Sequence, residues 1–526
     1  MRFFNTAGPV NPEDHYCLPP LGRLDLDDLL LLIAQKKYFV LHAPRQTGKT
    51  SLLLALRDYL NEEGNYHALY INIEAAQAMR ENVKEAMMII LSEITIRAEP
   101  DLGHRFLNDV RNAIREEDRV SSGLYNLLTT WAKRTEKPIV LFIDEIDSLI
   151  GDSLISTLRQ LRSGYDKRPD QFPQSIILCG VRDVRDYRIH SSAEKTIITG
   201  GSAFNVRAES LRMGNFNKAE LEALYQQHTT ETGQAFTAEA LDFAWTLTGG
   251  QPWLINALGY EVCFKMKENR DRNRAITVEM LRQAKENLIL RRETHLDQLA
   301  DKLDEARVQR IIAPILAGED DPEKLPTDDL QYVYDLGLIT LEGQIQIANK
   351  IYQEVIPREL TYSTQLTIAQ EPAWYIAQDG SLDIDKLLTG FQQFFRRHSE
   401  SWVERFDYKE AGPQLLLQAF LQRIINGGGR IEREYGFGRG RTDLLLTWFY
   451  GQDQVQEVVF ELKIRYGDLE KTIYQGLVQT WEYMDQCGTD QGHLVIFDRA
   501  PDKPWDEKIF RRERVYQDQP IIVWGM

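Results

Sequence analysis

The chain has few cysteines, no long apolar run and no excess of positive charge. Its four cysteines are spread over 526 residues without a CxxC pair, which argues against a disulfide framework or a zinc site and favours a reducing cytoplasm. The most apolar early run, residues 24–34, contains three aspartates, so we expect neither a signal peptide nor a membrane-spanning helix. A net charge of −17 disfavours broad electrostatic coating of nucleic acid, so any such contact must be local.

A loop typical of phosphate binding follows the first predicted strand, residues 38–42. The segment Ala43-Pro-Arg-Gln-Thr-Gly-Lys-Thr50 fits the phosphate-loop pattern, except that alanine replaces the first glycine. In such a loop the backbone N–H groups cradle the phosphates, Lys49 neutralises the β and γ oxygens, and the Thr50 hydroxyl binds Mg²⁺. We therefore predict a site for ATP or GTP. Its predicted cofactor-binding residues are Ala43, Pro44, Arg45, Gln46, Thr47, Gly48, Lys49, Thr50 and Arg182.

Two acids end another apolar strand, residues 138–143. Asp144 is placed to hold Mg²⁺ together with Thr50, and Glu145 to orient the attacking water as a catalytic residue. Arg182 follows the strand at 175–179 and is placed to contact the γ-phosphate. The alternative for Asp144 and Glu145 is that they only cap the strand. The alternative for Arg182 is that it is an ordinary surface arginine.

Strands alternate with helices up to about residue 215, which predicts an α/β fold with a parallel sheet covered on both faces. Helices follow, and residues 305–360 have the order of a winged helix, with a wing at 337–347. Its helix at 327–336 carries three acids and no base, which favours packing over DNA binding. The expected divisions are an N-terminal extension (1–22), a P-loop core (23–215), a helical lid (216–300), a winged-helix-like domain (301–362), a connector (363–400) and a second α/β domain (401–526).

The first part of the chain resembles the STAND-like branch of the AAA+ ATPases. The resemblance covers about residues 20–360 and rests on the motifs at 43–53 and 141–147, on Gly-Val-Arg at 180–182, and on Gly-Gly-Gln-Pro-Trp at 249–253. It implies a nucleotide-driven switch. In that branch the motif at 249–253 begins the helical lid and lies near the nucleotide. A homo-oligomer is compatible with it.

A second group of charged residues lies on two predicted strands near the C-terminus. Asp443 and Glu461 are suitable oxygen ligands for Mg²⁺ or Mn²⁺, and Lys463 can orient or deprotonate a water molecule. Strand alternation places Glu461 and Lys463 on one face and Leu462 on the other. The alternative is a half-buried hairpin whose ion pair serves stability, although such burial is costly.

These residues resemble the catalytic set of the PD-(D/E)xK nucleases over about residues 404–497. The resemblance assigns catalytic roles to Asp443, Glu461 and Lys463. It adds Glu410 as an acid on the first helix, and Gln479 and Tyr483 as a Gln-x-x-x-Tyr signature that supports the site and contacts substrate. The family's proline before the aspartate is absent here. The implied fold is a restriction-endonuclease-like α/β domain.

Basic residues cluster around the acidic strands. Solvated surface charge is the ordinary interpretation, but this position favours contact with phosphates. The clusters are Arg430, Arg433, Arg439 and Arg441, and then Lys508, Arg511, Arg512 and Arg514.

Together these features predict an ATP-regulated, metal-dependent nuclease. Its substrate is nucleic acid, with DNA favoured over RNA. Its expected biological role is in defence or in the processing of mobile DNA. One alternative is an ATPase switch or scaffold whose C-terminal domain binds nucleic acid or a partner without cutting. Another is a motor ATPase that translocates DNA.

Overall fold

The computed structural model divides the chain into two compact units. One unit comprises residues 1–245 and 250–284, and the other comprises residues 246–249 and 285–526. The residues that the structure describes are 1–183, 188–191, 196–199, 203–291, 294–317, 325–342, 345–367, 374–403, 411–425, 429–436, 441–451, 454–465, 467–500 and 503–526.

The first unit is built on a five-stranded, all-parallel sheet with the order β4-β5-β6-β3-β9. Its strands are β3 (Tyr38–His42), β4 (His67–Asn72), β5 (Ile139–Asp144), β6 (Ser175–Gly180) and β9 (Arg207–Arg212). The strands predicted at residues 38–42, 138–143 and 175–179 are confirmed within one residue at each end, and the sheet also contains β4 and β9. Because parallel strands end at the same sheet edge, the loop after β3 lies beside the ends of β6 and β5.

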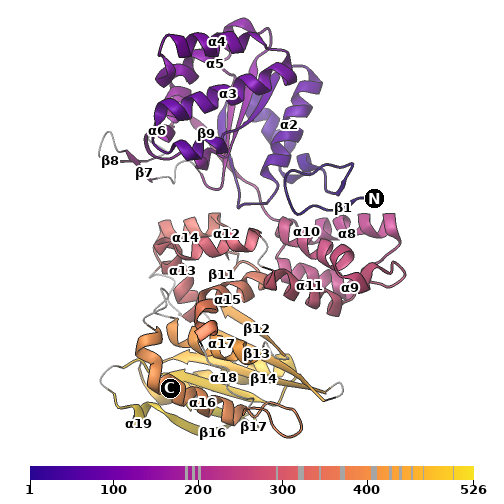
Figure 1. Cartoon of the computed structure of the whole chain (residues 1–526), viewed down its shortest axis with the longest axis vertical. Coiled ribbons are helices and arrows are strands. Elements are labelled where there is room, and N and C mark those ends of the chain that lie inside the picture. The colour runs from indigo at the N-terminus through magenta and orange to yellow at the C-terminus, as the bar shows by residue number, and fades with distance from the viewer. Residues whose placement is uncertain are drawn as a thin grey trace. The chain divides into compact units, whose positions relative to one another are not determined.

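Helices cover both faces of this sheet (Figure 1). One face packs against α3 (Val83–Leu102), α4 (Phe106–Glu116), α5 (Gly123–Arg134) and α6 (Gly151–Ser163). The other packs against α1 (Leu26–Ala34) and α2 (Lys49–Glu63). Alternate strand residues divide between the two cores, with Val40 in one and Phe39 and Leu41 in the other. A small hairpin, β7 (Arg188–Ser191) and β8 (Thr196–Thr199), precedes β9.

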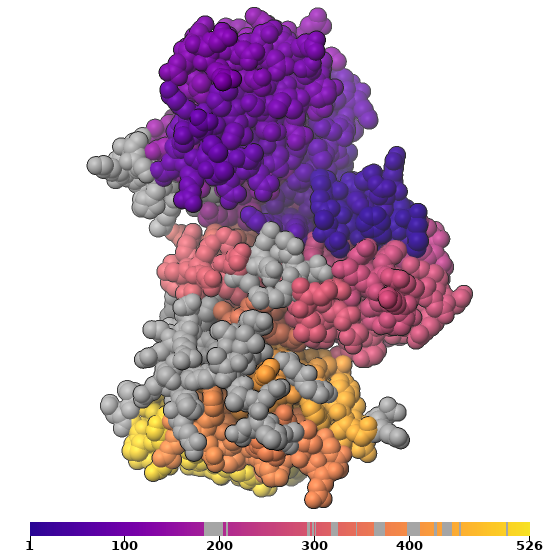
Figure 2. All heavy atoms as spheres, in the orientation of Figure 1, coloured from indigo at the N-terminus to yellow at the C-terminus, as the bar shows by residue number. Residues whose placement is uncertain are grey.

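The N-terminal residues fold against the helices of the lid. These helices are α8 (Lys218–Thr232), α9 (Ala238–Thr248), α10 (Pro252–Tyr260) and α11 (Val278–Leu290). Two short strands, β1 (Phe3–Phe4) and β2 (His15–Tyr16), form a parallel pair, and Arg2 forms an ion pair with Glu231 of α8. Figure 2 shows this indigo segment against the pink lid helices. Residues 1–22, expected to be an extension, are therefore part of the first unit.

The second unit begins with the element order expected of a winged helix. The elements are α12 (Thr294–Leu303), α13 (Ala306–Ala317), α14 (Thr327–Asp335), β10 (Ile339–Thr340), β11 (Gln346–Ile347) and α15 (Lys350–Thr367). Asp329 of α14 forms ion pairs with Arg307 and Arg310 of α13. This acid of α14 therefore packs within the domain.

A six-stranded mixed sheet forms the rest of the second unit, with the order β12-β13-β14-β15-β17-β16. Its strands are β12 (Gly429–Gly436), β13 (Arg441–Tyr450), β14 (Gln454–Ile464), β15 (Gly492–Phe497), β16 (Phe510–Tyr516) and β17 (Gln519–Gly525). Its helices are α16 (Ile384–Val403), α17 (Gly412–Ile425), α18 (Leu469–Cys487) and α19 (Trp505–Lys508).

Most of the expected connector, residues 363–400, is helical. It contains the end of α15 and most of α16. Gln392 of α16 donates hydrogen bonds to the carbonyls of Phe510 and Gly525, so α16 packs on the C-terminal sheet. In the part of the chain that the structure describes, no helix is both long and apolar enough to cross a membrane.

Candidate functional site

The loop after β3 has the geometry of a phosphate-binding loop. Lys49 is buried, and its Nζ donates to the carbonyls of Ala43 and Pro44, both at 3.0 Å. Gln46 and Gly48 have φ values of 58° and 95°. Such left-handed residues turn successive backbone N–H groups toward one concavity, which attracts anions. Ala43 is fully buried and has no positive φ, so alanine is tolerated where the pattern has glycine.

The two predicted Mg²⁺ ligands of this loop region lie together. The Thr50 hydroxyl donates to Asp144 Oδ2 at 2.7 Å, although the two residues are far apart in sequence. Asp144 is 0% exposed, and it also accepts from the Tyr70 hydroxyl at 2.9 Å. Hydroxyl and carboxylate oxygens are the ligands that Mg²⁺ prefers, so these residues fit the ion. Tyr70, at the end of β4, was not predicted, because a tyrosine in an apolar strand indicates only core packing.

Glu145 has the environment of a residue that positions water. Its backbone is left-handed, with φ 59°, and its N–H donates to Asp144 Oδ1 at 2.9 Å. Burial raises the pKa of the Glu145 carboxyl, and the charge of Asp144 raises it further. A carboxylate with a raised pKa is suited to accept a proton.

Asp147 fixes the turn that carries Arg182. Its Oδ2 accepts a short hydrogen bond from the Val181 N–H. A Cβ at Gly180 would lie 2.7 Å from that oxygen, which explains the glycine at the end of β6. Burial raises the pKa of Asp147, while the Val181 N–H and the charge of Arg182 act in the opposite direction. Asp147 was not predicted as a site residue. Its place in the Asp-Glu-Ile-Asp run was the only sequence feature that pointed to it.

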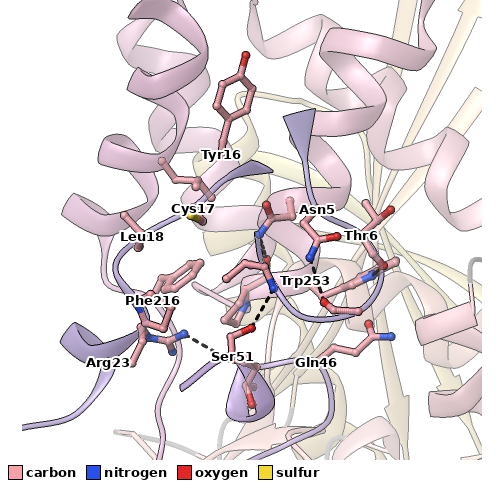
Figure 3. A pocket seen from close by; sticks show the side chains of 18 of the residues that line it. Asn5, Thr6, Tyr16, Cys17, Leu18, Arg23, Gln46, Ser51, Phe216 and Trp253 are labelled. Atoms are coloured by element: carbon pink, nitrogen blue, oxygen red, sulfur yellow. Dashed lines mark hydrogen bonds between the residues drawn. The ribbon is translucent and has the colours of Figure 1, made fainter. Parts of the chain in front are cut away.

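A cavity of about 130 Å³ adjoins the phosphate loop within the first unit (Figure 3). Arg23 lies over the Phe216 ring at 4.4 Å and donates to the Thr47 carbonyl at 3.0 Å. An apolar cavity of roughly 150 Å³ holds a benzene ring, so this one suits an aromatic base. Its lining includes Asn5, Thr6, Tyr16, Cys17, Arg23, Gln46, Phe216, Pro252, Trp253 and Asn256.

The N-terminal segment closes this cavity. The Val10 N–H donates to Ser51 Oγ at 3.1 Å, and Trp253 Nε1 donates to the Thr6 carbonyl at 2.9 Å (Figure 3). Asn256 Oδ1 is buried and accepts no hydrogen bond from the described residues. A buried acceptor without a donor in the wall of a cavity can accept a hydrogen bond from a ligand. No residue of the N-terminal segment was predicted as a contact, because that segment has no recognisable motif.

Two residues of the motif at 249–253 shape the same cavity. Gly250 has a φ of 77°, and a Cβ there would lie 2.1 Å from the Phe216 carbonyl oxygen. The Phe216 N–H donates to the Gly250 carbonyl at 2.8 Å. Pro252 lines the cavity directly. Gly250 therefore holds Phe216 in the cavity wall.

Asp443 and Glu461 are directly opposite each other on β13 and β14. Opposed residues of an antiparallel pair point to the same sheet face. Glu461 is 0% exposed, and Lys463 Nζ lies 2.9 Å from its Oε1. The backbone thus brings together three of the residues predicted as catalytic, although the Asp443 side chain is outside the described part of the structure.

The other predicted residues of this site differ in their placement. Gln479 and Tyr483 lie on α18, and Tyr483 is only 5% exposed, in a core with Val459 of β14. By alternation Val459 shares its face with Glu461, so α18 covers that face. Glu410 lies outside the described residues. Among the side chains that are described, no group of three or more metal-ligating residues lies together.

Two members of the basic clusters, Arg433 and Lys508, are buried within the protein, which corrects the expectation of a phosphate contact for these two. The Arg433 side chain is 1% exposed and pairs with Glu354 of α15. At the other edge of the sheet, Lys508 is buried. Arg511 pairs with Asp385, and Arg512 and Arg514 pair with Glu470. Arg439 and the Arg441 side chain lie outside the described residues.

The parallel sheet and its phosphate loop define the first part as a P-loop ATPase. The chain belongs to the AAA-like domain family, whose model matches residues 32–356, more than half of its length. A nucleotide, typically with Mg²⁺, is the ligand of this fold. A comparison with curated proteins gives no match.

Several solved structures are similar to this chain. A Walker-type ATPase of Pyrococcus abyssi has 18% identity and a TM-score of 0.45, with 67% of this chain and 99% of that chain covered. Cdc6p from Pyrobaculum aerophilum has 13% identity and a TM-score of 0.37, with coverages of 78% and 95%. The RuvB Holliday junction branch migration motor of Thermotoga maritima has 14% identity and a TM-score of 0.34, with coverages of 63% and 93%.

Proposed function

We propose that this protein is a STAND-like ATPase switch that controls a metal-dependent nuclease in its own C-terminal domain. The nuclease acts on nucleic acid, with DNA favoured. The observation that carries the proposal is the opposition of Asp443 and Glu461 on neighbouring strands, with Lys463 beside Glu461. That arrangement lies in the same chain as a complete phosphate loop.

In the ATPase part, the residues of the loop have separate tasks. Lys49 donates to two loop carbonyls, and its ammonium neutralises the β and γ oxygens of ATP. Thr50 and Asp144 would hold Mg²⁺, which neutralises charge on the phosphates when it is bound. Glu145 orients the attacking water, and Arg182 stabilises the γ-phosphate. The cavity beside the loop takes the base.

In the C-terminal part, burial argues for a site with a function. A fully buried carboxylate paired with one lysine is no more stable than apolar packing of the same volume. Asp443 and Glu461 would hold Mg²⁺ or Mn²⁺, which polarises the phosphodiester when it is bound. Lys463 orients or deprotonates the water that attacks. Glu410, Gln479 and Tyr483 remain proposed supports of this site.

The test is metal-dependent cleavage of plasmid, single-stranded DNA and RNA. Wild type is expected to cut with Mg²⁺ or Mn²⁺, and Asp443→Ala, Glu461→Ala and Lys463→Ala are each expected to abolish cutting. Glu457→Ala is the matched control, because Glu457 lies on the same strand and, by alternation, on the same face. Assays with ATP, a non-hydrolysable analogue, ADP and no nucleotide measure regulation. Absence of cutting under all these conditions contradicts the nuclease.

A non-cleaving switch is the second candidate. The observation that favours it is the burial of Tyr483 in the core with Val459, since the resemblance expects this side chain to contact substrate. In that case the C-terminal domain binds nucleic acid or a partner in a nucleotide-dependent manner, and no variant changes cleavage because there is none. A translocating motor, by contrast, requires continuous DNA-stimulated ATP turnover.

A further inference from the structure

Helix α15 is tied to the edge of the C-terminal sheet by a buried ion pair. Glu354 of α15 accepts a hydrogen bond from the Arg433 backbone N–H at 3.0 Å through Oε1, and from the Arg433 guanidinium through Oε2. The same guanidinium donates to Gln418 at 3.2 Å and to Gln422 at 2.7 Å, both on α17. All four side chains are buried. Figure 1 shows α15 lying beside α17 and β12.

A second arginine of α15 extends the Glu354–Arg433 ion pair into a chain of alternating charges. Arg358, one turn beyond Glu354, donates to Glu354 Oε2 at 3.3 Å. It also holds both oxygens of Glu286 of α11, at 2.9 and 3.2 Å. Burial raises the pKa of Glu286, but Arg358 and Lys285 lower it more, to about 2. Two acids and two arginines thus join α11, α15 and β12.

Gly249, which belongs to the second unit, packs against the residues just before α15. A Cβ at Gly249 would lie 2.9 Å from the Ala348 carbonyl oxygen and 3.3 Å from Asn349 Cβ, just before α15. The next residue, Gly250, holds Phe216 in the wall of the cavity. One peptide bond therefore connects Gly249, which packs just before α15, to Gly250, which shapes the cavity beside the phosphate loop.

Arg433, the second member of the ion pair, lies on the strand that pairs with the Asp443 strand. Arg433 on β12 is opposite Leu444 on β13, and the next pair of residues is Glu434 and Asp443. A displacement of Arg433 along its strand direction is transmitted to Asp443, because the two strands share a hydrogen-bonded ladder.

We propose that Glu354 and Arg433 form a joint that makes the position of the Asp443 strand depend on the nucleotide state. This inference rests on the proposed function. Arg433 is a positioning residue in it. Apolar residues would stabilise such an interface as well as an ion pair does, whereas the two-point contact of Glu354 with the backbone and side chain of Arg433 fixes its direction.

The test separates stability from coupling. Glu354→Leu leaves Arg433 buried without its carboxylate, and Arg433→Met leaves Glu354 with Arg358 as its remaining charged partner, so each is expected to lower the unfolding midpoint, and the double variant is expected to regain part of it. Wild type is expected to cut at least ~10-fold faster in one nucleotide state than in the other, within the usual range of coupling. The double variant is expected to cut with less than a ~2-fold difference. A double variant that keeps the wild-type ratio overturns the proposal.

The control and the second readout make failure interpretable. Asp385→Leu with Arg511→Met removes an ion pair at the other edge of the same sheet and is expected to leave the nucleotide dependence unchanged. Hydrogen exchange of the β12 and β13 amides with an ATP analogue and with ADP measures the joint without cleavage. A nucleotide-dependent difference that is lost in the double variant supports the joint even if wild type does not cut. Cutting without any such difference overturns the joint while the nuclease stands.

Discussion

Mild acid is expected to loosen the C-terminal sheet because of one buried histidine. His493 of β15 stacks on Phe460 with ring centroids 5.4 Å apart, and its Nδ1 accepts from Trp524 Nε1 at 3.1 Å. Burial lowers the pKa of His493 from 6.5 to about 4, with smaller effects from Asp385 and Arg511. The neighbour of Phe460 on β14 is Glu461, so this histidine supports the acidic strand.

The magnitude follows from the two pKa values. Above pH 6.5 the imidazole is neutral in both the folded and the unfolded chain, so the free energy of unfolding is unaffected. Below pH 6.5 only the unfolded chain takes up the proton, so stability falls until the folded pKa, near 4, is reached. A difference of 2.5 units at 1.36 kcal/mol per unit amounts to about 3 kcal/mol, of which about 2 kcal/mol is lost by pH 5.

The assay is hydrogen exchange of peptides from β14 and β15 between pH 8 and pH 4.5, with exchange corrected for intrinsic rates. His493→Gln is expected to flatten the pH dependence of the opening free energy by about 2 kcal/mol at pH 5, because glutamine takes up no proton. His15→Gln, in the first unit, is the matched control. An unchanged pH slope in His493→Gln refutes the assignment. As the pH is lowered, we also expect DNA cutting to be lost before nucleotide binding, because His493 supports the strand that carries Glu461.

Three further substitutions test the two sites. Lys49→Ala is expected to weaken ATP binding by roughly 10- to 100-fold, through loss of a charge-assisted hydrogen bond, as measured by calorimetry. Gly250→Ala places a Cβ 2.1 Å from the Phe216 carbonyl oxygen, so we expect a lower thermal midpoint and weaker ATP binding, and an unchanged affinity contradicts the cavity's role. Lys463→Met is expected to abolish cutting while ATP turnover in the first unit is kept, and residual cutting at the wild-type rate contradicts a role for Lys463 in catalysis.

Local patterns were enough to predict the P-loop ATPase fold of the first part of the chain. The loop at 43–50 and the acids at 144 and 145 each follow a short, fully buried strand, and buried parallel strands are readable as continuous apolar runs. The alternation of strands and helices then predicted a parallel sheet, which brings strand ends to one edge. The contact between Thr50 and Asp144 is a consequence of that rule.

Long-range packing decided the parts that no motif marks. Residues 1–22 carry no recognisable pattern, yet they close the cavity beside the phosphate loop, because they contact the Ser51 and Trp253 side chains through a backbone N–H and a backbone carbonyl, which any sequence can supply. The Tyr70 hydroxyl likewise reaches Asp144, a predicted Mg²⁺ ligand, through the pairing of β4 with β5.

Arg433 shows most clearly what the sequence alone establishes and what it leaves open. Its charge and its position near Asp443 are written in the sequence, and they favoured a phosphate contact. Whether an arginine meets solvent or a buried carboxylate depends on which distant segment packs on it, and here that segment is α15, which carries Glu354. Charge and periodicity are local properties, whereas the partner of a buried charge is chosen by the tertiary fold.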